Sequence, residues 1–476
     1  MGHAYDAQVQ NVYSAPHQAS NAGQRLLAPS NDTKMSGIKG MDVGQPSVAG
    51  APPGDAAVDP AVTSGAMRPL WLEHGVKQEQ FPKLTQSLET DVCVVGAGIS
   101  GLTVAYTLAK SGVGVVVLDD GNIGSGETGR TTAHLMSNMD DRFTTLEYLH
   151  GQRGAQLATE SHMEAINYIE RIVRDEQIDC DFKRLDGYLF EKESKRNDTR
   201  NVRVEMEAAL RCGLSGVYLV PRAPCPGFDT GEAYCAPRQG RLHAIKYLNG
   251  LAKAAVRHGA HIYTNSRVLK WEGSNKNEAT VSVDGDLTVR CKHVVVATNT
   301  PAQNRLVIHA KLSIERSYVV TAEIPRGSYT DALFWDMEDP YHYVRFQEGP
   351  PDANWDVIIV GGEDHPIGRQ ANEPVEQIYR RLEQWGRARW PNMGRILECW
   401  SGQIAEPVDA LAYIGRNPHD YPNIYIVTGD SGQGMTHGTI SGTREHIEHQ
   451  SWWCSGHAID RSAVSPFKLG TLLQAC

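Results

Sequence analysis

The first clear pattern of apolar and polar positions begins at residue 91. Residues 91–98 (DVCVVGAG) form a short β-branched run that ends in glycine, which is typical of a buried strand. Apolar positions then recur at helical spacing through residues 99–112, and that segment also ends in glycine. Residues 113–120 (VGVVVLDD) again have the pattern of a buried strand. Together these segments predict one strand–helix–strand unit.

Further along the chain, helical and alternating patterns follow one another. Amphipathic helices are predicted at residues 152–176, 200–212, 242–259 and 373–390. Strands are predicted within residues 261–273 and 292–300, and residues 312–362 alternate with period two, as in an antiparallel sheet. Residues 423–442 predict a strand, a glycine turn and the start of a helix. This order of elements predicts an α/β nucleotide-binding domain interrupted by a smaller α+β domain.

The composition is that of a globular protein with a polar N-terminal tail. The chain has 476 residues, which is too many for one compact core, so two domains, or one domain with a large insertion, are expected. Residues 1–70 are rich in Gly, Pro, Ala and Ser and lack apolar periodicity, and we expect a disordered tail there. No apolar run approaches the roughly 20 residues that cross a bilayer, so no membrane span is expected.

Charge and cysteine content exclude some classes of partner and compartment. Lys and Arg number 46 and Asp and Glu number 56, a net charge of −10 without a basic block, so nucleic acid is not an expected partner. The nine cysteines are scattered and form no C-x-x-C pair. This usage favours reduced thiols, and hence a cytoplasmic protein, over a disulfide framework.

A glycine motif lies between the first strand and its helix. Gly96, Gly98 and Gly101 have the spacing G-x-G-x-x-G, and Asp119 ends the second strand 18 residues after Gly101. In this context the first glycine permits a tight turn, the second lets the backbone approach a pyrophosphate, and the third lets helix and strand pack closely. The helix N-terminus offers free N–H groups to the anion, and Asp119 can accept a hydrogen bond from a ribose hydroxyl. The motif predicts a dinucleotide-binding site.

These glycines alone do not distinguish FAD from NAD. Residues 124–134 (GSGETGRTTAH) stay rich in glycine and hydroxyl groups, as an extended cofactor requires, although a helix cap with a solvated Arg130 is the alternative. In residues 427–442 (VTGDSGQGMTHGTISG), four glycines precede a helix whose N-terminus can stabilise negative charge on a reduced flavin. Two such elements, about 300 residues apart, favour FAD.

Several long strings carry a resemblance to a known family. They are IGSGETGRTTAHL, DCDFKRLDGYLF, DPYHYVRF, VGGEDH, EPVDALAYIGRNP and TGDSGQGMTHGTISG. Through them, residues 70–445 resemble the FAD-dependent oxidoreductases of the D-amino-acid oxidase superfamily, the group that contains glycine oxidase and sarcosine oxidase. More narrowly, the chain resembles a subfamily whose members often carry a Rieske iron–sulfur domain at the C-terminus.

The resemblance implies FAD as the cofactor and a set of residues that contact it. The set is Gly96, Gly98, Ile99, Ser100, Gly101, Asp119, Gly126, Arg130, Thr131, Thr132, Ala133, His134, Val268, Thr298, Asn299, Gly432, Gly434, Met435 and Thr436. Within it, Val268 is implied to contact the adenine, and residues 432–436 the pyrimidine edge of the flavin. Asp119 stands where the subfamily usually has glutamate, which shortens the reach but keeps the chemistry.

The resemblance also implies how the chain divides into domains. A discontinuous Rossmann-like FAD-binding domain is expected at residues 88–187, 236–307 and 395–450. An inserted α+β substrate domain, built on a mostly antiparallel sheet, is expected at residues 188–235 and 308–394.

Residues 451–476 form an atypical C-terminal segment compared with the subfamily. A Rieske cluster needs a C-x-H and a C-x-x-H pair, and Cys454 and His457 supply only the second pattern. We therefore expect no metal centre. Electrons are then expected to pass from the flavin to oxygen or to a separate acceptor.

One predicted strand carries the candidate contacts to substrate. Tyr341, Tyr343 and Arg345 recur with period two and share one face. In related amine oxidases an arginine near this strand holds the substrate carboxylate, a task that suits a planar guanidinium, whereas the alternative is an ion pair with a surface acid. Tyr318 and Trp335 could extend the two tyrosines into an aromatic wall for an amine cation, with core packing as an equal alternative.

Three histidines lie in or beside these motifs. His134 and His437 fall in the two flavin-facing motifs, and either is a candidate for tuning the pKa of the flavin. His342 alternates out of phase with the two neighbouring tyrosines, so it is expected to be structural.

The leading hypothesis is an enzyme, a FAD-dependent oxidoreductase that oxidises a C–N bond of an amine or amino-acid-like small molecule by hydride transfer to flavin N5. A flavin monooxygenase or a C–C or C–O dehydrogenase on the same fold is an alternative, since fold does not fix the reaction. A further alternative is a FAD-binding protein without turnover, which would serve as a scaffold or electron-transfer partner.

Overall fold

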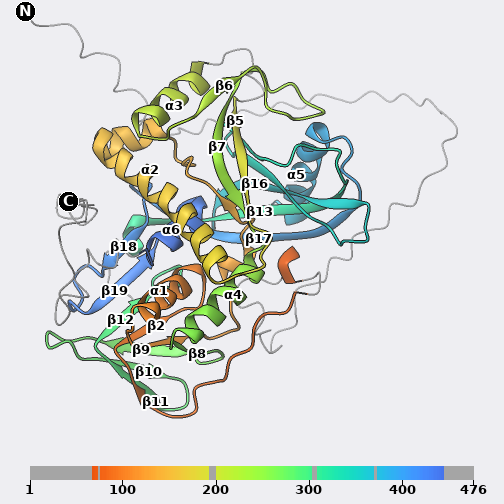
Figure 1. Cartoon of the computed structure of the whole chain (residues 1–476). Helices are drawn as coiled ribbons and strands as arrows, with labels where there is room; N and C mark the ends of the chain where they lie inside the picture. Colours follow the sequence, from red (N-terminus) through yellow and green to blue (C-terminus); the bar gives the residue numbers. More distant parts are fainter. Residues whose placement is uncertain (1–66, 73–75, 192–199, 303–307, 369–372, 444–476) are drawn as a thin grey trace, which may run out of the picture. The chain divides into compact units, whose positions relative to one another are not determined.

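The computed structural model describes residues 67–72, 76–191, 200–302, 308–368 and 373–443, which form three sheets and their covering helices (Figure 1). Most of the predicted tail and all of the predicted C-terminal segment, including Cys454 and His457, lie outside these residues. Leu70 and Trp71, in the short helix η1 (Leu70–Leu72), are buried, so the folded part of the chain includes the last residue of the predicted tail. Among the described residues, no helix combines the length and the apolar character that crossing a bilayer needs.

Six short strands form a mostly parallel sheet in the order β18-β19-β12-β2-β3-β8. They are β2 (Val92–Val95), β3 (Val115–Leu118), β8 (His261–Tyr263), β12 (His293–Val296), β18 (Tyr413–Arg416) and β19 (Ile424–Thr428). All neighbours in this sheet are parallel except β18 and β19. Every residue of β2 and β3 is buried, as expected of a parallel sheet covered on both faces. The predicted strand–helix–strand unit is confirmed.

Helices pack on this sheet and on one another (Figure 1). They are α1 (Ile99–Lys110), α2 (Phe143–Asp175), α4 (Ala244–Arg257) and α6 (Gly434–Ile440), and α1 contacts both α4 and α6. Helix α2 is interrupted at Gly151, whose φ is +66°. This interruption explains why the apolar periodicity predicts a helix only from residue 152, although helical structure already begins at Phe143.

A small four-stranded sheet lies beside the parallel one. It consists of β1 (Leu88–Glu89), β9 (Val268–Glu272), β10 (Ala279–Val283) and β11 (Leu287–Cys291), in the order β1-β11-β10-β9. The three longer strands form an antiparallel meander, and β1 pairs with β11 in parallel. Buried residues of this meander and of β2, β3 and β12 share one apolar cluster, so the two sheets have a common core.

The third sheet is large and mainly antiparallel. Its strands are β4 (His134–Leu135), β5 (Lys183–Phe190), β6 (Tyr218–Val220), β7 (Ala233–Arg241), β13 (Leu312–Pro325), β14 (Leu333–Asp336), β15 (His342–Gln347), β16 (Trp355–Pro366) and β17 (Ile396–Pro407). The main order is β17-β13-β16-β15-β14-β5-β7-β4, and β6 pairs with β7. Helices α3 (Arg200–Arg211) and α5 (Val375–Arg389) contact strands of this sheet. The α/β fold with an added antiparallel sheet is therefore confirmed.

The sheets do not follow the predicted domain boundaries closely. β5 crosses the predicted boundary at residue 187, and β7 crosses the one at residue 235. β17 pairs with β13 over most of its length, so residues 396–407 belong to the large sheet although the sequence assigns them to the FAD-binding domain. The apolar pattern of a strand does not determine which sheet the strand joins. The predicted domain boundaries therefore differ from the observed sheets.

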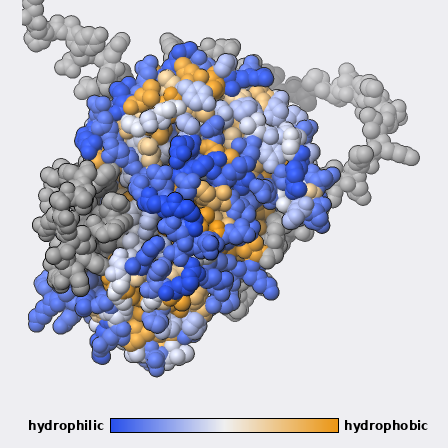
Figure 2. All heavy atoms as spheres, viewed as in Figure 1, coloured by the Kyte–Doolittle hydropathy of each residue, from blue (hydrophilic) through white to orange (hydrophobic). Residues whose placement is uncertain are grey.

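The surface is mostly polar on the face that Figure 2 shows. Apolar side chains gather near α3 at the top of that view, where Val204 and Leu210 are about half exposed, at 50% and 46%. Helix α3 is short and amphipathic, and its buried residues Val202, Ala208 and Ala209 pack under the large sheet. A small group of half-exposed apolar side chains such as this one is normal on a protein surface.

Candidate functional site

A cavity of about 600 Å³ is lined by residues from all three sheets. Part of its wall comes from the turn after β2, from the ends of β3 and β12, and from β9 of the small sheet. The rest comes from β13, β15 and β17 of the large sheet and from residues 430–435. The cavity thus opens at the carboxyl edge of the parallel sheet, where α/β folds bind their ligands, and its size suits a cofactor.

The turn between β2 and α1 leaves no room for side chains. Gly96 has a φ of +106°, and a Cβ added there would lie 2.3 Å from the carbonyl oxygen of Ala297. A Cβ on Gly101 would lie 1.9 Å from the oxygen of Gly96. Gly98 is the N-cap of α1 and provides no side-chain cap, and the N–H of Ile99 donates to Oγ1 of Thr128. The other N–H groups of the first turn have no acceptor within the helix, so they can serve a ligand.

Asp119 connects the end of β3 to this turn. Its Oδ2 accepts a hydrogen bond of 2.6 Å from the N–H of Ala97, and its Oδ1 accepts one of 2.9 Å from the N–H of Gly121. Burial raises the pKa of Asp119 to about 7, despite these backbone hydrogen bonds. Each carboxylate oxygen can accept a further hydrogen bond, so the side chain still suits a ribose hydroxyl at the cavity wall.

Arg130 carries a buried donor without a partner. The side chain is 4% exposed, and its Nε donates a hydrogen bond of 2.6 Å to the carbonyl of Ser401. Trp400 Nε1 donates to the carbonyl of Arg130 at 2.7 Å. Trp400 and Ser401 are neighbours on β17, so this strand holds both the backbone and the side chain of Arg130. Nη1 of Arg130 is buried and has no hydrogen-bond partner among the described residues. Because Arg130 lines the cavity, this donor calls for an oxygen of a bound ligand.

The residues after Arg130 form a strained turn at the cavity wall. Ala133 has a left-handed φ of +57°, and its N–H donates to Oγ1 of Thr131 at 3.0 Å. Trp71 Nε1 donates to the carbonyl of Thr131 at 2.6 Å. These bonds hold a backbone conformation that costs free energy for a residue with a Cβ, and such strain is common at binding sites.

His134 follows this turn and is neutral. Its Nδ1 lies 3.0 Å from Oγ1 of Thr132, and its Nε2 lies 3.3 Å from the carbonyl oxygen of Val344. Burial, reinforced by the charge of Arg345, lowers the pKa of His134 to about 3. The ring also packs edge-on against Tyr343, with centroids 5.5 Å apart. His134 therefore offers the cavity an uncharged polar ring.

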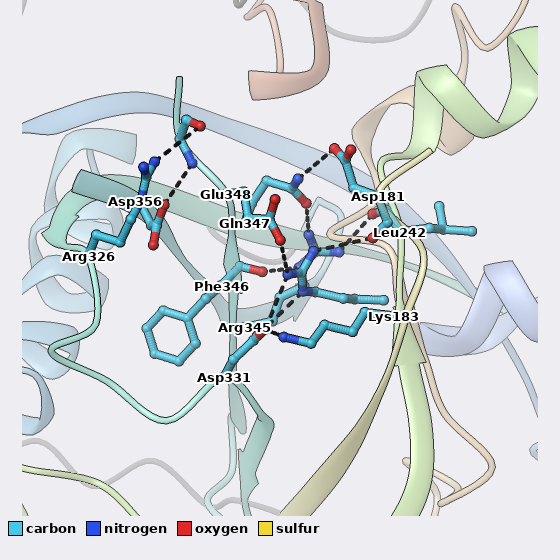
Figure 3. Close-up of polar contacts among 12 residues, drawn as sticks. Asp181, Lys183, Leu242, Arg326, Asp331, Arg345, Phe346, Gln347, Glu348 and Asp356 are labelled. Carbon is cyan, nitrogen blue, oxygen red and sulfur yellow. Dashed lines mark hydrogen bonds and ion pairs between the residues drawn. The ribbon is translucent and has the colours of Figure 1, made fainter. Parts of the chain in front are cut away.

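Arg345 is fully buried and does not line the cavity. Figure 3 shows its guanidinium in contact with Leu242, Phe346 and Gln347. Its guanidinium donates to three backbone carbonyls, those of Ala133 at 3.1 Å, Leu242 at 2.9 Å and Phe346 at 3.2 Å. A fourth hydrogen bond goes to Oε1 of Gln347. These contacts use the donors of Arg345 on carbonyl and amide oxygens, so we assign it neither to a substrate carboxylate nor to a surface ion pair. It braces the turn at Ala133 instead.

Two tyrosines of the large sheet do line the cavity. The hydroxyl of Tyr341 lies 3.4 Å from Oδ2 of Asp140, and the hydroxyl of Tyr343 lies 2.8 Å from Oγ of Ser317. The centroids of the two rings are 5.5 Å apart. All four residues line the cavity, and we call this part of the wall the tyrosine end.

The other aromatic residues near β15 are packed in the protein. Tyr318 and Trp335 are buried in two apolar clusters of the large sheet and are not among the cavity-lining residues. His342 is also buried, with Nδ1 3.0 Å from Oδ2 of Asp336. Burial alone would lower the pKa of His342, but hydrogen bonds to Asp336 and Glu363 raise it to about 9. This partnered imidazolium fits the structural role expected for His342.

The glycine-rich element near the end of the described chain meets the tyrosine end. Helix η5 (Ser431–Gln433) leads directly into α6. A Cβ on Gly432 would lie 2.6 Å from Oδ2 of Asp140 and 3.0 Å from the hydroxyl of Tyr341, so a glycine is required there. Ser431 Oγ donates to Oε2 of Glu406 at 2.8 Å. The element thus packs tightly under a group of acidic side chains.

His437 lies deeper than this element. Its Nδ1 is 2.8 Å from the carbonyl oxygen of Asp430, and its ring centroid is 4.4 Å from that of His162 on α2. Burial lowers the pKa of His437 to about 4. His437 does not line the cavity, whereas Asp430, to which it is hydrogen-bonded, does. His437 could therefore affect a cofactor only indirectly, through Asp430.

The structure brings most of the predicted site residues to one cavity. Those that line it are Gly96, Gly98, Ile99, Ser100, Asp119, Gly126, Arg130, Thr131, Thr132, His134, Val268, Thr298, Asn299, Tyr341, Tyr343, Gly432, Gly434 and Met435. Those that do not are Gly101, Ala133, Arg345, Thr436 and His437. Gly101 and Ala133 shape the backbone beside the cavity instead of facing it.

The sequence reasoning missed several residues of the wall. Thr128 accepts a hydrogen bond of 3.1 Å from the N–H of Ile99, and Asp140, Ser317 and Asp430 line the tyrosine end or its neighbourhood. Thr128 lies inside the predicted 124–134 motif, where its hydroxyl was a visible signal. Asp140 lies 201 residues from Tyr341, and no local pattern connects two such distant positions.

The donors of this cavity fit the chemistry of FAD. A glycine turn that leads into a helix N-terminus suits a pyrophosphate, and Asp119 suits a ribose hydroxyl. Arg130 has an unpartnered buried N–H, which matches the phosphate or carbonyl oxygens of this cofactor.

Comparison with known proteins agrees with this fit. The family model described as "FAD dependent oxidoreductase" matches residues 91–444. Gamma-glutamylputrescine oxidoreductase of Escherichia coli is 28% identical over 372 residues, which are 76% of this chain and 83% of that protein. A Bacillus subtilis protein named for a Rieske 2Fe-2S iron–sulfur cluster is 26% identical over 364 residues, which are 76% of this chain and 69% of that protein.

The fold is also found among solved structures. The structure of L-proline dehydrogenase from P. horikoshii superimposes with a TM-score of 0.62 at 19% sequence identity. The superposition covers 77% of this chain and 94% of that one.

Proposed function

Since the chain belongs to the FAD-dependent oxidoreductase family and uses FAD, we propose that it oxidises a C–N bond of an amine or amino-acid-like small molecule. The observation that carries the proposal is the continuity of one cavity from the glycine turn to the tyrosine end. A cavity of this kind holds a dinucleotide and leaves its reactive end beside polar and aromatic side chains.

The proposal gives the chain's residues two tasks. Gly96, Gly98 and the N-terminus of α1 would hold the pyrophosphate of FAD, and Asp119 the adenosine ribose. Arg130 would donate its free N–H to a cofactor oxygen. Bound FAD supplies the two-electron chemistry by accepting a hydride from the carbon next to nitrogen. The protein therefore has to orient that carbon and exclude water around it.

The tyrosine end suits this orienting task. The rings of Tyr341 and Tyr343 provide flat aromatic faces that attract ammonium groups. His134 stays neutral throughout the physiological pH range, because its pKa is about 3, so it adds no repulsion toward a cationic amine. The printed names of two similar proteins, gamma-glutamylputrescine oxidoreductase and L-proline dehydrogenase, also refer to amine-type compounds and support this substrate class.

Anaerobic flavin reduction tests the proposal directly. The purified FAD-containing protein is mixed with a panel of amines, amino acids and matched alcohols without oxygen, and the flavin absorbance band is followed. Bleaching by a nitrogen compound, with none by the matched alcohol, is the expected result. Bleaching by the alcohols alone would overturn the proposal in favour of C–O oxidation. Readmission of air then shows whether the reduced protein passes electrons to oxygen or needs a separate acceptor.

A further inference from the structure

The tyrosine end is surrounded by carboxyl groups from three different segments. Asp140 and Asp141 precede α2, Asp364 lies on β16, and Glu406 lies on β17. We call these four residues the acid cluster. Asp140 lines the cavity itself, and Ser431 Oγ bridges Glu406 at 2.8 Å and Asp141 at 3.2 Å directly beside it.

Two oxygens of the acid cluster have no hydrogen-bond donor. Oδ1 of Asp140 and Oδ1 of Asp364 are buried and accept no hydrogen bond from the described residues. The side chains of Gln433 and Tyr341 interact with Asp140, and the contact from the hydroxyl of Tyr341 to Oδ2 is long, at 3.4 Å. Buried carboxylate oxygens normally have partners, and Asp140 lines the cavity, so its Oδ1 lacks a donor that a bound ligand can supply.

The protein provides no cation to neutralise the cluster from the cavity side. The described residues that line the cavity include two arginines, Arg130 and Arg267, of which the first is bound to Ser401 and the second adjoins β9 of the small sheet. Arg142, whose charge partly offsets the rise in the pKa of Asp140 and Asp141, does not line the cavity and donates to the carbonyl of Asp336 at 3.1 Å. The tyrosine end is therefore an anionic region that faces an open cavity.

Burial and mutual repulsion raise the pKa values of the carboxyl groups in the acid cluster. Burial, followed by repulsion from Asp141, raises the pKa of Asp140 to about 6. Burial and repulsion from Asp140 raise the pKa of Asp364 to about 7, and burial and repulsion from Asp141 raise that of Glu406 to about 8. A positively charged ligand would relieve this repulsion, whereas a carboxylate would increase it.

We propose that the tyrosine end selects a substrate with a second cationic group, such as a diamine, and discriminates against one with a free carboxylate. This inference rests on the proposed amine oxidation. One nitrogen would be next to the carbon that is oxidised. The second, as an ammonium group, would donate a hydrogen bond to Asp140, which lines the cavity, and Asp364 behind it would add to the attraction by its charge. Specificity then has an attractive part, the acid cluster, and a repulsive part, the cost of burying a carboxylate beside it.

Three probes with the same four-carbon chain separate these contributions. They are tetramethylenediamine with two ammonium groups, butylamine with one, and γ-aminobutyrate with one ammonium and one carboxylate. Calorimetric titration of the FAD-containing protein measures their binding without requiring turnover. We expect the diamine to bind about tenfold or more tightly than butylamine, and γ-aminobutyrate to bind more weakly than both. Equal binding of all three, tighter binding of γ-aminobutyrate, or no binding would overturn the inference.

Matched variants test the assignment to the acid cluster. Asp140→Asn and Asp364→Asn each remove one negative charge, and we expect either to reduce the preference for diamine over butylamine about tenfold. Asp352→Asn, at an exposed position away from the cavity, serves as the control and should keep the preference. An unchanged preference in both cluster variants would overturn the inference. Should either variant fail to fold, the three-probe comparison on the unchanged protein still decides.

Anaerobic mixing with the same probes distinguishes this inference from the proposed function. A diamine that binds selectively without bleaching the flavin would support cation selection and contradict C–N oxidation. A flavin bleached equally fast by all three probes would support C–N oxidation and overturn cation selection.

Discussion

Arg130 and Arg345 are both buried arginines, but their hydrogen-bond situations differ. Every nitrogen of Arg345 contacts a carbonyl or amide oxygen of the protein, so this side chain is complete without a ligand. Arg130 keeps Nη1 free at the cavity wall. Because an unpaired buried N–H on a charged group is costly, the two arginines indicate different roles, support of the backbone for Arg345 and ligand contact for Arg130.

Arg130→Met should weaken FAD binding. A hydrogen bond to a charged group contributes about 1.5–3 kcal/mol, so the dissociation constant of FAD should rise roughly tenfold to a hundredfold. Flavin fluorescence during reconstitution of the apoprotein measures this constant. Arg316→Met is the matched control, since Arg316 donates to Oγ of the same Ser401 at 2.9 Å but does not line the cavity. Unchanged FAD affinity in the Arg130 variant would refute the assignment.

At the scale of elements, the turn between β2 and α1 offers a test of close packing. Gly96 and Gly259 have nearly the same φ, +106° and +102°, so an alanine at either position has the same left-handed strain. A Cβ on Gly259 meets nothing within 4 Å, whereas one on Gly96 would lie 2.3 Å from the oxygen of Ala297. The pair therefore separates backbone strain from steric clash.

Gly259→Ala should lower the free energy of unfolding by about 1–2 kcal/mol and leave FAD affinity unchanged. Gly96→Ala should cost more and also weaken FAD binding, because Ala297 must move and the adjacent Thr298 and Asn299 line the cavity. Urea unfolding followed by circular dichroism measures the stability, and flavin fluorescence measures the affinity. Equal losses in both variants would show that the contact with Ala297 does not matter.

Elements defined by local pattern were predictable from the sequence, and those defined by distant pairing were not. The unit from residue 91 to 120 has its strands, helix and glycine turn in one short stretch, and the structure confirms it. The membership of β17 in the large sheet depends on its pairing with β13, about 80 residues away along the chain. Asp140 illustrates the same limit for the site, because only the fold brings it to Tyr341.

At the scale of the whole molecule, the cavity lies where a parallel sheet meets a large antiparallel one. The parallel sheet provides the glycine turn and Asp119, and the large sheet with the residue before β15 provides the tyrosines and half of the acid cluster. This division places the predicted cofactor contacts and the proposed substrate contacts on separate structural layers. Substrate preference can therefore change through residues of the large sheet while the cofactor site stays intact.

The acid cluster also makes diamine binding depend on pH. The pKa values of Asp140 and Asp141 are about 6, that of Asp364 is about 7 and that of Glu406 is about 8, all raised by burial. Below pH 6 most of these groups are neutral, and they gain negative charge as the pH rises through these values. A diamine stays doubly charged over this range, because alkyl ammonium groups titrate near 10. Diamine affinity should therefore increase between about pH 6 and pH 8.

The bound diamine should also lower these pKa values, so binding within this window should release protons. Other charged groups near the cluster are Glu315, Arg142 and the imidazolium of His342, whose pKa of about 9 keeps it protonated through most of the window. Calorimetry at three pH values, in two buffers with different ionisation enthalpies, gives both affinity and proton count. Butylamine, with one charge, should show the smaller pH dependence. A diamine affinity that stays flat or falls as the pH rises would mean that the acid cluster does not contact the ligand.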